Sequence, residues 1–239
     1  MGIIASRGSG KTTLLANLLT KKEFFKDKFN DIIILSPTYK NDLDKWNFIC
    51  SKNVLVENPN TPKKENYAEK LDKKDKFIKK ITKLYDDPDE YPEIIQTVSN
   101  NQQNFIDEFG KPAADKILIV LDDVLGSSVL KSKELMKNIA NSRHKNLSFI
   151  IISQSYFQIL KTVRLNITCW ILFHTGNRKE LDLIYEENNC GYSAKEFEKI
   201  FYNITNEPFK FLVINYQNPI KYRLLNSFQT FIIKKISNE

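Results

Sequence analysis

The sequence has little cysteine, few arginines and no long apolar run, and each shortage excludes a class of protein. No apolar stretch approaches the roughly 20 residues that a membrane-crossing helix needs. No charged start followed by an apolar stretch and a small-residue cleavage site marks a signal peptide. The three cysteines, Cys50, Cys169 and Cys190, are widely spaced and odd in number, which argues against a disulfide framework or a zinc site and is typical of a reducing compartment.

Arginine is scarce in a chain that is otherwise basic. The 239 residues carry 36 Lys and Arg against 29 Asp and Glu, a formal net charge of +7. The arginines are Arg7, Arg143, Arg164, Arg178 and Arg223. A basic chain suits a polyanion such as DNA, but an excess of lysine also follows from an AT-rich genome, so charge alone decides little. The length and the 41% hydrophobic content predict one globular domain with an insertion.

Short apolar runs alternate with helix-like stretches along most of the chain. Runs such as "DIIIL", "ILIVL" and "FIIIS" are almost continuously apolar, as strands are when a parallel sheet is covered on both faces. The predicted strands are Gly2–Ala5, Ile32–Leu35, Val54–Val56, Ile117–Leu121, Phe149–Ile152, Cys169–Phe173, Phe211–Ile214 and Tyr222–Leu225. The predicted helices are Lys11–Leu19, Asn41–Ile49, Lys131–Ala140, Lys179–Glu187 and Ala194–Tyr202. This alternation predicts an α/β domain with a mostly parallel sheet flanked by helices.

Residues 60–112 interrupt this alternation and predict two or three polar helices with no strand. Lys63–Lys83 contains nine lysines and four acidic residues, whereas Leu84–Phe109 contains seven acidic residues and no lysine or arginine. One interpretation is a solvated helical hairpin whose two arms attract each other through Lys–Asp/Glu pairs. The other is an insertion that faces DNA or a neighbouring subunit. We therefore predict a single domain over residues 1–239 with a charged helical insertion at 60–112, before the strand at 117–121.

The stretch "ASRGSGKTT" at residues 5–13 nearly matches the phosphate loop G-x-x-x-x-G-K-[ST], with Ala5 at the first glycine. It follows a predicted strand and opens an amphipathic helix, the context that this loop requires. Its glycines let backbone N–H groups converge on phosphate oxygens, and the helix adds its positive end. The residues expected to bind the nucleotide are Ser6, Arg7, Gly8, Ser9, Gly10, Lys11, Thr12 and Thr13. Lys11 would reach the β- and γ-phosphates and Thr12 would bind magnesium, so ATP and Mg²⁺ are the expected cofactors.

A second motif, "KILIVLDDVLG", is a buried strand that ends in two acidic residues, as a Walker B motif does. Asp122 is the predicted magnesium ligand, directly or through water, and Asp123 is predicted to orient and deprotonate the attacking water. An acid beside the metal ligand favours hydrolysis over a signalling GTPase, and no guanine-reading N-K-x-D stretch is present. Taken alone, the same letters also fit an ordinary strand followed by an acidic turn.

A third strand, "LSFIIISQS", ends in Ser153 and Gln154. In many ATPases that hydrolyse at a parallel sheet, a polar residue here lies between the phosphate loop and the Walker B strand and senses the γ-phosphate. Gln154 suits that role because its amide can hold both the phosphate and the attacking water, and a plain strand-end polar residue is the alternative. Thr38 and Tyr39 of "SPTY" follow another strand, where α/β sheets place ligands, and are predicted to contact DNA or a subunit, or to form a simple turn.

Together these motifs resemble the FtsK–HerA class of P-loop ATPases, and more closely the poxvirus-type genome-packaging ATPase of large DNA viruses and virophages. The stretches that carry the resemblance are "GSGKTTLLANLL", "IIILSPTY" with Trp46, "ILIVLDD", "NSRHKNLSFIIISQSYFQI" and "VRLNITCWILF". The resemblance covers residues 1–175 and implies a P-loop NTPase core. The sequence departs from the family pattern at Ala5, where the family loop commonly has glycine, and in beginning at the first strand.

The resemblance implies a ring-shaped homo-oligomer, a pentamer or hexamer, that drives double-stranded DNA into a capsid. It implies contact with capsid proteins but not with a membrane, and a location in the viral factory of the host cytoplasm or in the virion. Such rings complete each site with an arginine from the next subunit, for which Arg143 and Arg164 are the candidates. Arg7 lies inside the loop and would contact the nucleotide of its own subunit. The predicted catalytic set is Lys11, Asp123, Gln154, Arg143 and Arg164.

Two other functions stay open on the sequence alone. A nucleoside or nucleotide kinase also uses a phosphate loop on a parallel sheet, but it generally carries a lid of arginines, and the chain after Gln154 has few. The paired acids of the Walker B motif favour water as the acceptor. A non-catalytic assembly factor would bind ATP and form rings without hydrolysing the nucleotide.

Overall fold

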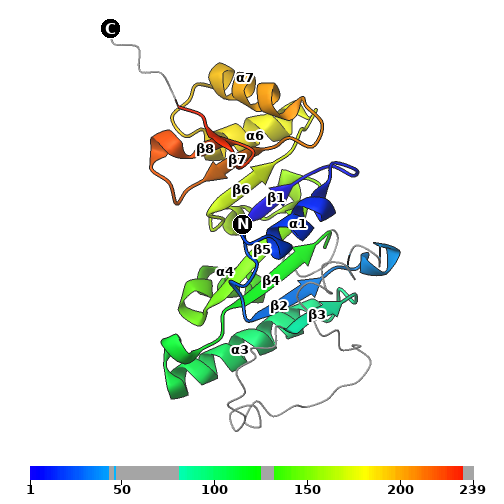
Figure 1. The fold of residues 1–239 in the computed structure, drawn as a ribbon, viewed down its shortest axis with the longest axis vertical. Coiled ribbons are helices and arrows are strands. Elements are labelled where there is room, and N and C mark those ends of the chain that lie inside the picture. Colours follow the sequence, from blue (N-terminus) through cyan, green and yellow to red (C-terminus); the bar gives the residue numbers. More distant parts are fainter. Residues whose placement is uncertain (43–45, 47–80, 125–131, 234–239) are drawn as a thin grey trace.

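A mixed sheet of nine strands forms the centre of the computed structural model, which describes residues 1–42, 46, 81–124 and 132–233 (Figure 1). The strands are β1 (Gly2–Ile4), β2 (Asp31–Leu35), β3 (Ile81–Tyr85), β4 (Ile117–Asp122), β5 (Leu147–Ser153), β6 (Cys169–Leu172), β7 (Leu212–Asn215), β8 (Leu224–Asn226) and β9 (Thr230–Phe231). Their order across the sheet is β3-β2-β4-β5-β1-β6-β7-β8-β9. Strands β1 to β6 are parallel, and β7, β8 and β9 extend the sheet in antiparallel fashion.

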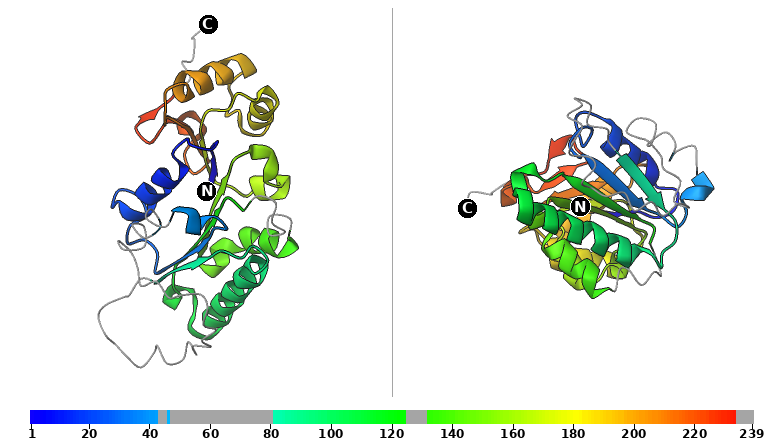
Figure 2. Two further views of the ribbon diagram at one scale, coloured as in Figure 1. Left: turned by 90° about the vertical axis from the view of Figure 1, so that its right-hand side faces the viewer. Right: turned by 90° about the horizontal axis from the view of Figure 1, so that it is seen from below.

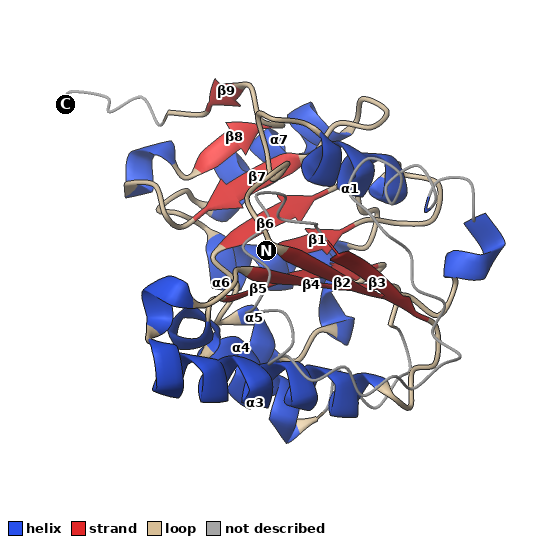
Figure 3. Ribbon diagram, turned by 60° about the horizontal axis from the view of Figure 1, so that its bottom comes forward, coloured by secondary structure: helices blue, strands red, loops and turns tan. Residues whose placement is uncertain are grey.

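Helices cover both faces of the sheet, as Figures 2 and 3 show. The helices are α1 (Lys11–Thr20), α3 (Tyr91–Phe109), α4 (Lys133–Ala140), α5 (Lys161–Arg164), α6 (Arg178–Asn188) and α7 (Ala194–Thr205). Helix α1 packs on one face through its leucines, in a core shared with Trp46. The other five pack on the opposite face. None of the helices in the described ranges is long and apolar enough to cross a membrane.

The central strands contribute side chains to both cores, which explains their continuous apolar sequences. In β2, Ile32 and Ile34 face α1, whereas Ile33 and Leu35 face the helices on the other side. All six residues of β4 are buried. Successive side chains of a strand point to opposite faces, so a strand covered on both sides has no position for an exposed polar residue. The predicted α/β fold with a mostly parallel, helix-flanked sheet is confirmed.

The prediction of no strand between residues 60 and 112 is wrong. Strand β3 pairs with β2 along its whole length, from Asp31 opposite Ile81 to Leu35 opposite Tyr85. Its sequence "ITKLY" lies at the edge of the sheet, where a lysine is compatible with a strand and masks the apolar pattern. The acidic half of the region forms the long helix α3, as predicted. The remainder, 60–80, lies outside the described residues, so the charge-paired hairpin stays a prediction.

Other boundaries differ in smaller ways. The predicted strand at 54–56 and most of the predicted helix at 41–49 lie outside the described residues. The strand predicted from Tyr222 begins at Leu224, because a 3₁₀ turn occupies Ile220–Tyr222. Strand β9 and the single turn of α5 were not predicted, because both are too short to show a periodic pattern.

Candidate nucleotide site

The predicted nucleotide and magnesium residues, together with Asp123 and Gln154, meet at the carboxyl edge of the parallel strands, whereas Arg143 and Arg164 lie elsewhere. Strand β5 lies between β1 and β4, with Ile4 opposite Ser153 and Asp122 opposite Ile152. The loop after β1, the acids that end β4 and the residue after β5 therefore share one edge. A crevice at this edge is where open α/β sheets bind ligands.

The phosphate loop turns sharply from β1 into α1. Gly8 and Gly10 have φ of 79° and 93°, a left-handed conformation that side chains rarely tolerate. Gly10 is the N-cap of α1, and the helix has neither a side-chain cap nor an acidic residue in its first turn. Its first N–H groups and its positive end therefore face the loop without a competing anion from these positions.

Ala5, which stands where the phosphate-loop pattern has its first glycine, fits the end of strand β1. Its N–H bonds to the Ser153 carbonyl oxygen at 3.0 Å and its side chain is 1% exposed, within the core below α1. It is not among the residues with positive φ. The first loop position here is thus a continuation of β1, where alanine causes no backbone strain. Arg7 is exposed, and Lys11 and Thr12 are half-buried in the first turn of α1.

Asp122 is a buried carboxylate with a strongly perturbed acidity. Its side chain accepts a hydrogen bond from Ser36 Oγ at 3.1 Å, and Asp122 is 8% exposed. Burial raises its pKa to about 6, and the adjacent Asp123 raises it as well, whereas Ser36 and Lys11 lower it. Ser36 is the fully buried residue that directly follows β2. Ser36 was not predicted from the sequence, although its place directly after a buried strand is a usable signal.

Asp123 and Gln154 form a pair across the edge. Gln154 Nε2 donates to Asp123 Oδ1 at 2.9 Å and to Oδ2 at 3.1 Å. Asp123 has φ of 51°, a left-handed conformation that is uncommon outside glycine and is often found at functional sites. The pair joins the carboxylate that follows β4 to the amide that follows β5.

Magnesium fits the oxygen donors of this edge. No cluster of three or more His, Cys, Asp or Glu side chains occurs in the described part of the chain, so an all-protein metal cage is not present there. Mg²⁺ usually binds one or two protein oxygens together with substrate phosphates and water. The Thr12 hydroxyl and the buried Asp122 carboxylate are hard oxygen ligands of that kind, and a cation would favour the charged form that burial disfavours.

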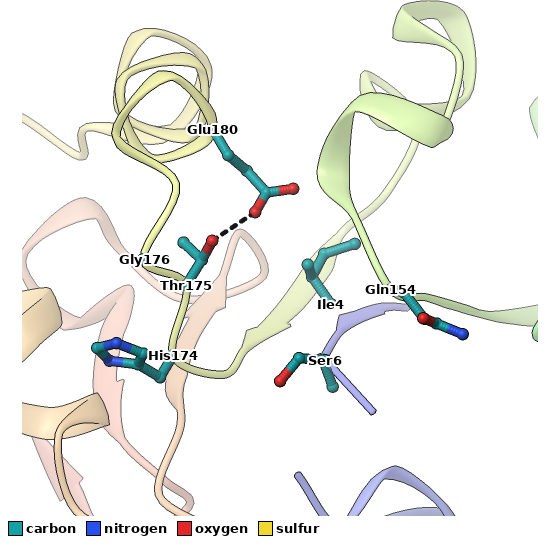
Figure 4. A pocket seen from close by; sticks show the side chains of 8 residues that line it. Ile4, Ser6, Gln154, His174, Thr175, Gly176 and Glu180 are labelled. Carbon is teal, nitrogen blue, oxygen red and sulfur yellow. Dashed lines mark hydrogen bonds between the residues drawn. The ribbon is translucent and has the colours of Figure 1, made fainter. Parts of the chain in front are cut away.

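A small cavity beside this edge has a volume of about 190 Å³ (Figure 4). It lies between Ser6, Gln154 and the loop that follows β6. Glu180 of α6, 4% exposed, accepts hydrogen bonds from Ser155 Oγ at 2.6 Å, from the Tyr156 N–H at 2.6 Å and from Thr175 Oγ1 at 2.7 Å. The carboxylate thus links the segment after Gln154 to the β6–α6 loop. Sequence reasoning missed it, because an acid near the start of a helix is usually read as a helix-dipole partner.

The two candidate trans arginines have different environments. The Arg164 guanidinium donates to Glu187 through Nε at 2.8 Å and Nη2 at 2.7 Å, and its side chain is 8% exposed. It also stacks on Tyr156, with the guanidinium carbon 4.9 Å from the ring centre. Arg143 is exposed in the 3₁₀ turn that precedes β5, at the edge opposite the phosphate loop. Within one subunit, Arg164 therefore has partners of its own and Arg143 faces outward.

A family model, that of the poxvirus A32 protein, matches residues 75–214, which is more than half of the chain. The chain belongs to the poxvirus A32 protein family. The matched range includes Asp122, Asp123 and Gln154 and begins after the phosphate loop. The resemblance to the poxvirus-type packaging ATPase is thereby confirmed.

Solved structures of packaging NTPases share the fold of this A32-family chain. The genome-packaging NTPase B204 of Sulfolobus turreted icosahedral virus 2, in complex with ATP-γ-S, matches at 15% identity with a TM-score of 0.55, covering 90% of this chain and 91% of that one. B204 from Sulfolobus turreted icosahedral virus matches at 13% identity with a TM-score of 0.58 and the same coverage. The conjugation coupling protein TcpA of pCW3 matches at 11% identity with a TM-score of 0.53, covering 94% of this chain and 60% of that one. No curated protein sequence matches the chain.

Proposed function

We propose that the chain is an ATP-hydrolysing motor that moves double-stranded viral DNA into a capsid. The observation that carries the proposal is the Asp123–Gln154 pair, held at the same edge as the phosphate loop by the insertion of β5 between β1 and β4. This arrangement suits water as the acceptor, since a carboxylate next to an amide can both orient and deprotonate it. The family match and the packaging NTPases of similar fold support the coupling to DNA.

The residues divide the chemistry between them. The loop Ser6–Thr13 cradles the phosphates, with Lys11 on the β- and γ-phosphates. Thr12 and Asp122 would hold Mg²⁺, which would supply positive charge to neutralise the phosphates. Asp123 accepts a proton from the attacking water. The oxygen of that water bonds to the γ-phosphorus as the bond from the γ-phosphorus to the bridging oxygen of the departing ADP breaks.

Gln154 begins bound to Asp123 and presents its NH₂ group to the carboxylate, because a carboxylate only accepts hydrogen bonds. Its carbonyl oxygen stays available to accept a hydrogen bond from the water. When a γ-phosphate is present, the NH₂ group of Gln154 can donate a hydrogen bond to that phosphate instead of to Asp123. This frees Asp123 to act as the base. Gln154 thereby couples the presence of the γ-phosphate to the activation of water.

The remaining charge on the transferred phosphoryl group requires an arginine from a neighbouring subunit, and we propose Arg143 for that role. Its exposure leaves it free to enter a second site, whereas Arg164 is held by Glu187. This assignment makes a homo-oligomeric ring necessary for full activity, with DNA and capsid proteins as partners. We propose one ATPase domain over residues 1–239, acting in the viral factory or the virion.

The proposal is tested by phosphate release from ATP and Mg²⁺, with and without double-stranded DNA. The expected result is turnover that DNA accelerates and that Lys11→Ala abolishes, while Lys195→Ala, at an exposed position of α7, retains it. A set of nucleosides and nucleotides added as acceptors separates hydrolysis from kinase activity. Transfer of phosphate to one of them, or ATP binding without any turnover, would show that the chain is not a motor.

A further inference from the structure

We infer that the loop between α7 and β7, residues 206–211, binds the base of the nucleotide, and that Phe209 is the surface on which the base stacks. The inference rests on the proposed function, because it takes the phosphates to lie in the loop around Lys11. It adds a base-binding region to a site otherwise defined only by its phosphate and magnesium contacts.

The order of the strands indicates on which side of β1 the γ-phosphate and the nucleoside would lie. The groups that would act on the γ-phosphate, Asp122, Asp123 and Gln154, all lie on the β4–β5 side of β1. Strand β6 borders β1 on its other side. A triphosphate that passes through the loop with its γ-phosphate toward β4 must therefore leave its nucleoside on the side of β6 and β7.

A second and larger cavity lies on that side. Its volume is about 480 Å³, within the range of roughly 300–1,000 Å³ that is typical of small-molecule sites. It is bordered by the phosphate loop at Ser6, Gly8 and Ser9, by Phe173 and His174 directly after β6, and by residues 205–210. Because β7 is antiparallel to β6, the loop that enters β7 returns to the same edge as the phosphate loop (Figure 1).

Phe209 has the properties of a stacking platform in this cavity. It is 69% exposed although it is a large apolar residue, and its φ is 64°, a left-handed conformation that is strained for an aromatic side chain. Its ring lies against the phosphate loop, with Cδ1 only 3.2 Å from the position that a Cβ on Gly10 would occupy. Strain of this kind persists where the surrounding structure fixes it, commonly in ligand-binding segments.

A hydrogen bond within the loop and a buried ring at its end hold the loop in place. Lys210 N–H bonds back to the Glu207 carbonyl oxygen at 3.2 Å. Phe211, two residues after the platform, is buried and packs against Phe173, with ring centres 5.2 Å apart, and against Phe228 at 5.1 Å. The exposed ring is therefore carried by a rigid support, which lowers the entropy lost when a base stacks on it.

The test compares the affinities of ATP and of inorganic tripolyphosphate, which has no base. Stacking of one base on an aromatic side chain predicts that Phe209→Ala weakens ATP binding about 5- to 150-fold and leaves tripolyphosphate binding unchanged. Phe209→Gly is the second variant, because glycine adopts the left-handed conformation without strain and removes the ring alone. Phe209→Trp should retain ATP affinity, with a tryptophan fluorescence that ATP quenches and tripolyphosphate does not.

The controls separate this inference from the proposed function. Phe109→Ala removes another exposed ring, 45% exposed against 69% for Phe209, at the end of α3, and should bind both ligands as the wild type does. Normal ATP affinity in Phe209→Gly would overturn the base platform while leaving the motor intact. Equal losses for both ligands would assign Phe209 to the support of the phosphate loop, and a change in oligomeric state alone would assign it to a subunit contact. A wild-type chain that binds neither ligand would overturn the proposed function itself.

Discussion

The acidic residues on the two sides of β1 are held in opposite ways. On the β4–β5 side, burial raises the pKa of Asp122 to about 6, and Asp123 adopts a left-handed conformation. On the α6 side, the Arg164 guanidinium holds the pKa of Glu187 below its usual range, and Glu180 accepts three hydrogen bonds. The Asp122 charge is therefore poorly compensated until a cation arrives, whereas the charges of Glu187 and Glu180 already have their partners.

This difference separates a candidate chemical role, that of Asp122, from a structural role, that of Glu180 and Glu187. A carboxylate that the fold destabilises is ready to bind a metal or to accept a proton. A carboxylate that is fully bonded holds segments together, as Glu187 does for α5 and α6 and Glu180 for the ends of β5 and β6. Each of the following substitutions tests one side of the comparison.

The largest effect is expected for Asp123→Asn. The substitution keeps the shape of the side chain but removes the base, so ATP turnover should fall about 10²- to 10⁴-fold, the usual contribution of general base catalysis. The affinity for ATP and the thermal midpoint should change little, as measured by nucleotide titration and calorimetry. Turnover within threefold of the wild type would exclude Asp123 as the base.

Arg164→Ala should act on stability. Removing one partner of this partly buried pair should cost about 1–3 kcal/mol, because it leaves the Glu187 carboxylate without its charged donor, and urea unfolding measures this. Arg178→Ala, whose side chain is 55% exposed, is the matched control and should leave the free energy of unfolding nearly unchanged. A stable Arg164→Ala variant with lost turnover would instead identify Arg164 as the trans arginine.

The contribution of Glu187 to the stability of the fold should decrease as the pH falls. The pKa of Glu187 is lower in the folded state than in the unfolded state. The stability that Glu187 contributes is therefore fully present above its unfolded-state pKa and is lost as the pH falls through its folded-state pKa. Arg164→Ala should remove this dependence, so the wild type and the variant should converge in stability in acid.

Asp122→Asn should stabilise the protein, whereas Arg164→Ala should destabilise it. The pKa of Asp122 is raised from 3.8 to about 6 in the folded state. Asp122 therefore stabilises the fold at a pH below its unfolded-state pKa, and this stabilisation is lost as the pH rises through about 6. Without Mg²⁺, the variant should be about 1–3 kcal/mol more stable than the wild type at pH 8. The two proteins should become alike near pH 4. A variant that is less stable at pH 8 would show that Asp122 is satisfied without a metal.

The smallest effect is expected for Ser36→Ala. Loss of the hydroxyl donor should raise the pKa of Asp122 further and weaken the binding of ATP with Mg²⁺ by about 1 kcal/mol, or roughly fivefold. Titration with and without Mg²⁺ measures the difference. An equal loss in both conditions would separate Ser36 from the metal.

Much of the fold could be predicted because the sheet is buried on both faces. Continuous apolar runs identified the strands β2, β4 and β5, and the phosphate loop identified the turn from β1 into α1. Edge strand β3 was missed, since a strand with one neighbour and Lys83 in its centre does not show an apolar run. The antiparallel pairing of β7 with β6 joins segments that lie far apart in the chain, which a sequence pattern does not contain, and β9 is only two residues long.

The site was predictable to the extent that each residue follows a strand. Asp122, Asp123 and Gln154 were assigned on that ground, and the structure brings them to one edge. Glu180 lies on a helix and its three donors come from separate loops, so only the tertiary structure identifies its role. Arg164 shows the converse problem, because an arginine that acts in trans and one that holds a glutamate look alike in a sequence.

The most direct test of the central claim is the displacement of a third strand from a triplex on double-stranded DNA, measured with ATP and Mg²⁺. A motor that uses this site should displace the strand at a rate that depends on ATP, and Lys11→Ala and Asp123→Asn should not displace it. Displacement by either variant at the wild-type rate, or ATP turnover by the wild type without any displacement on DNA, would contradict the account.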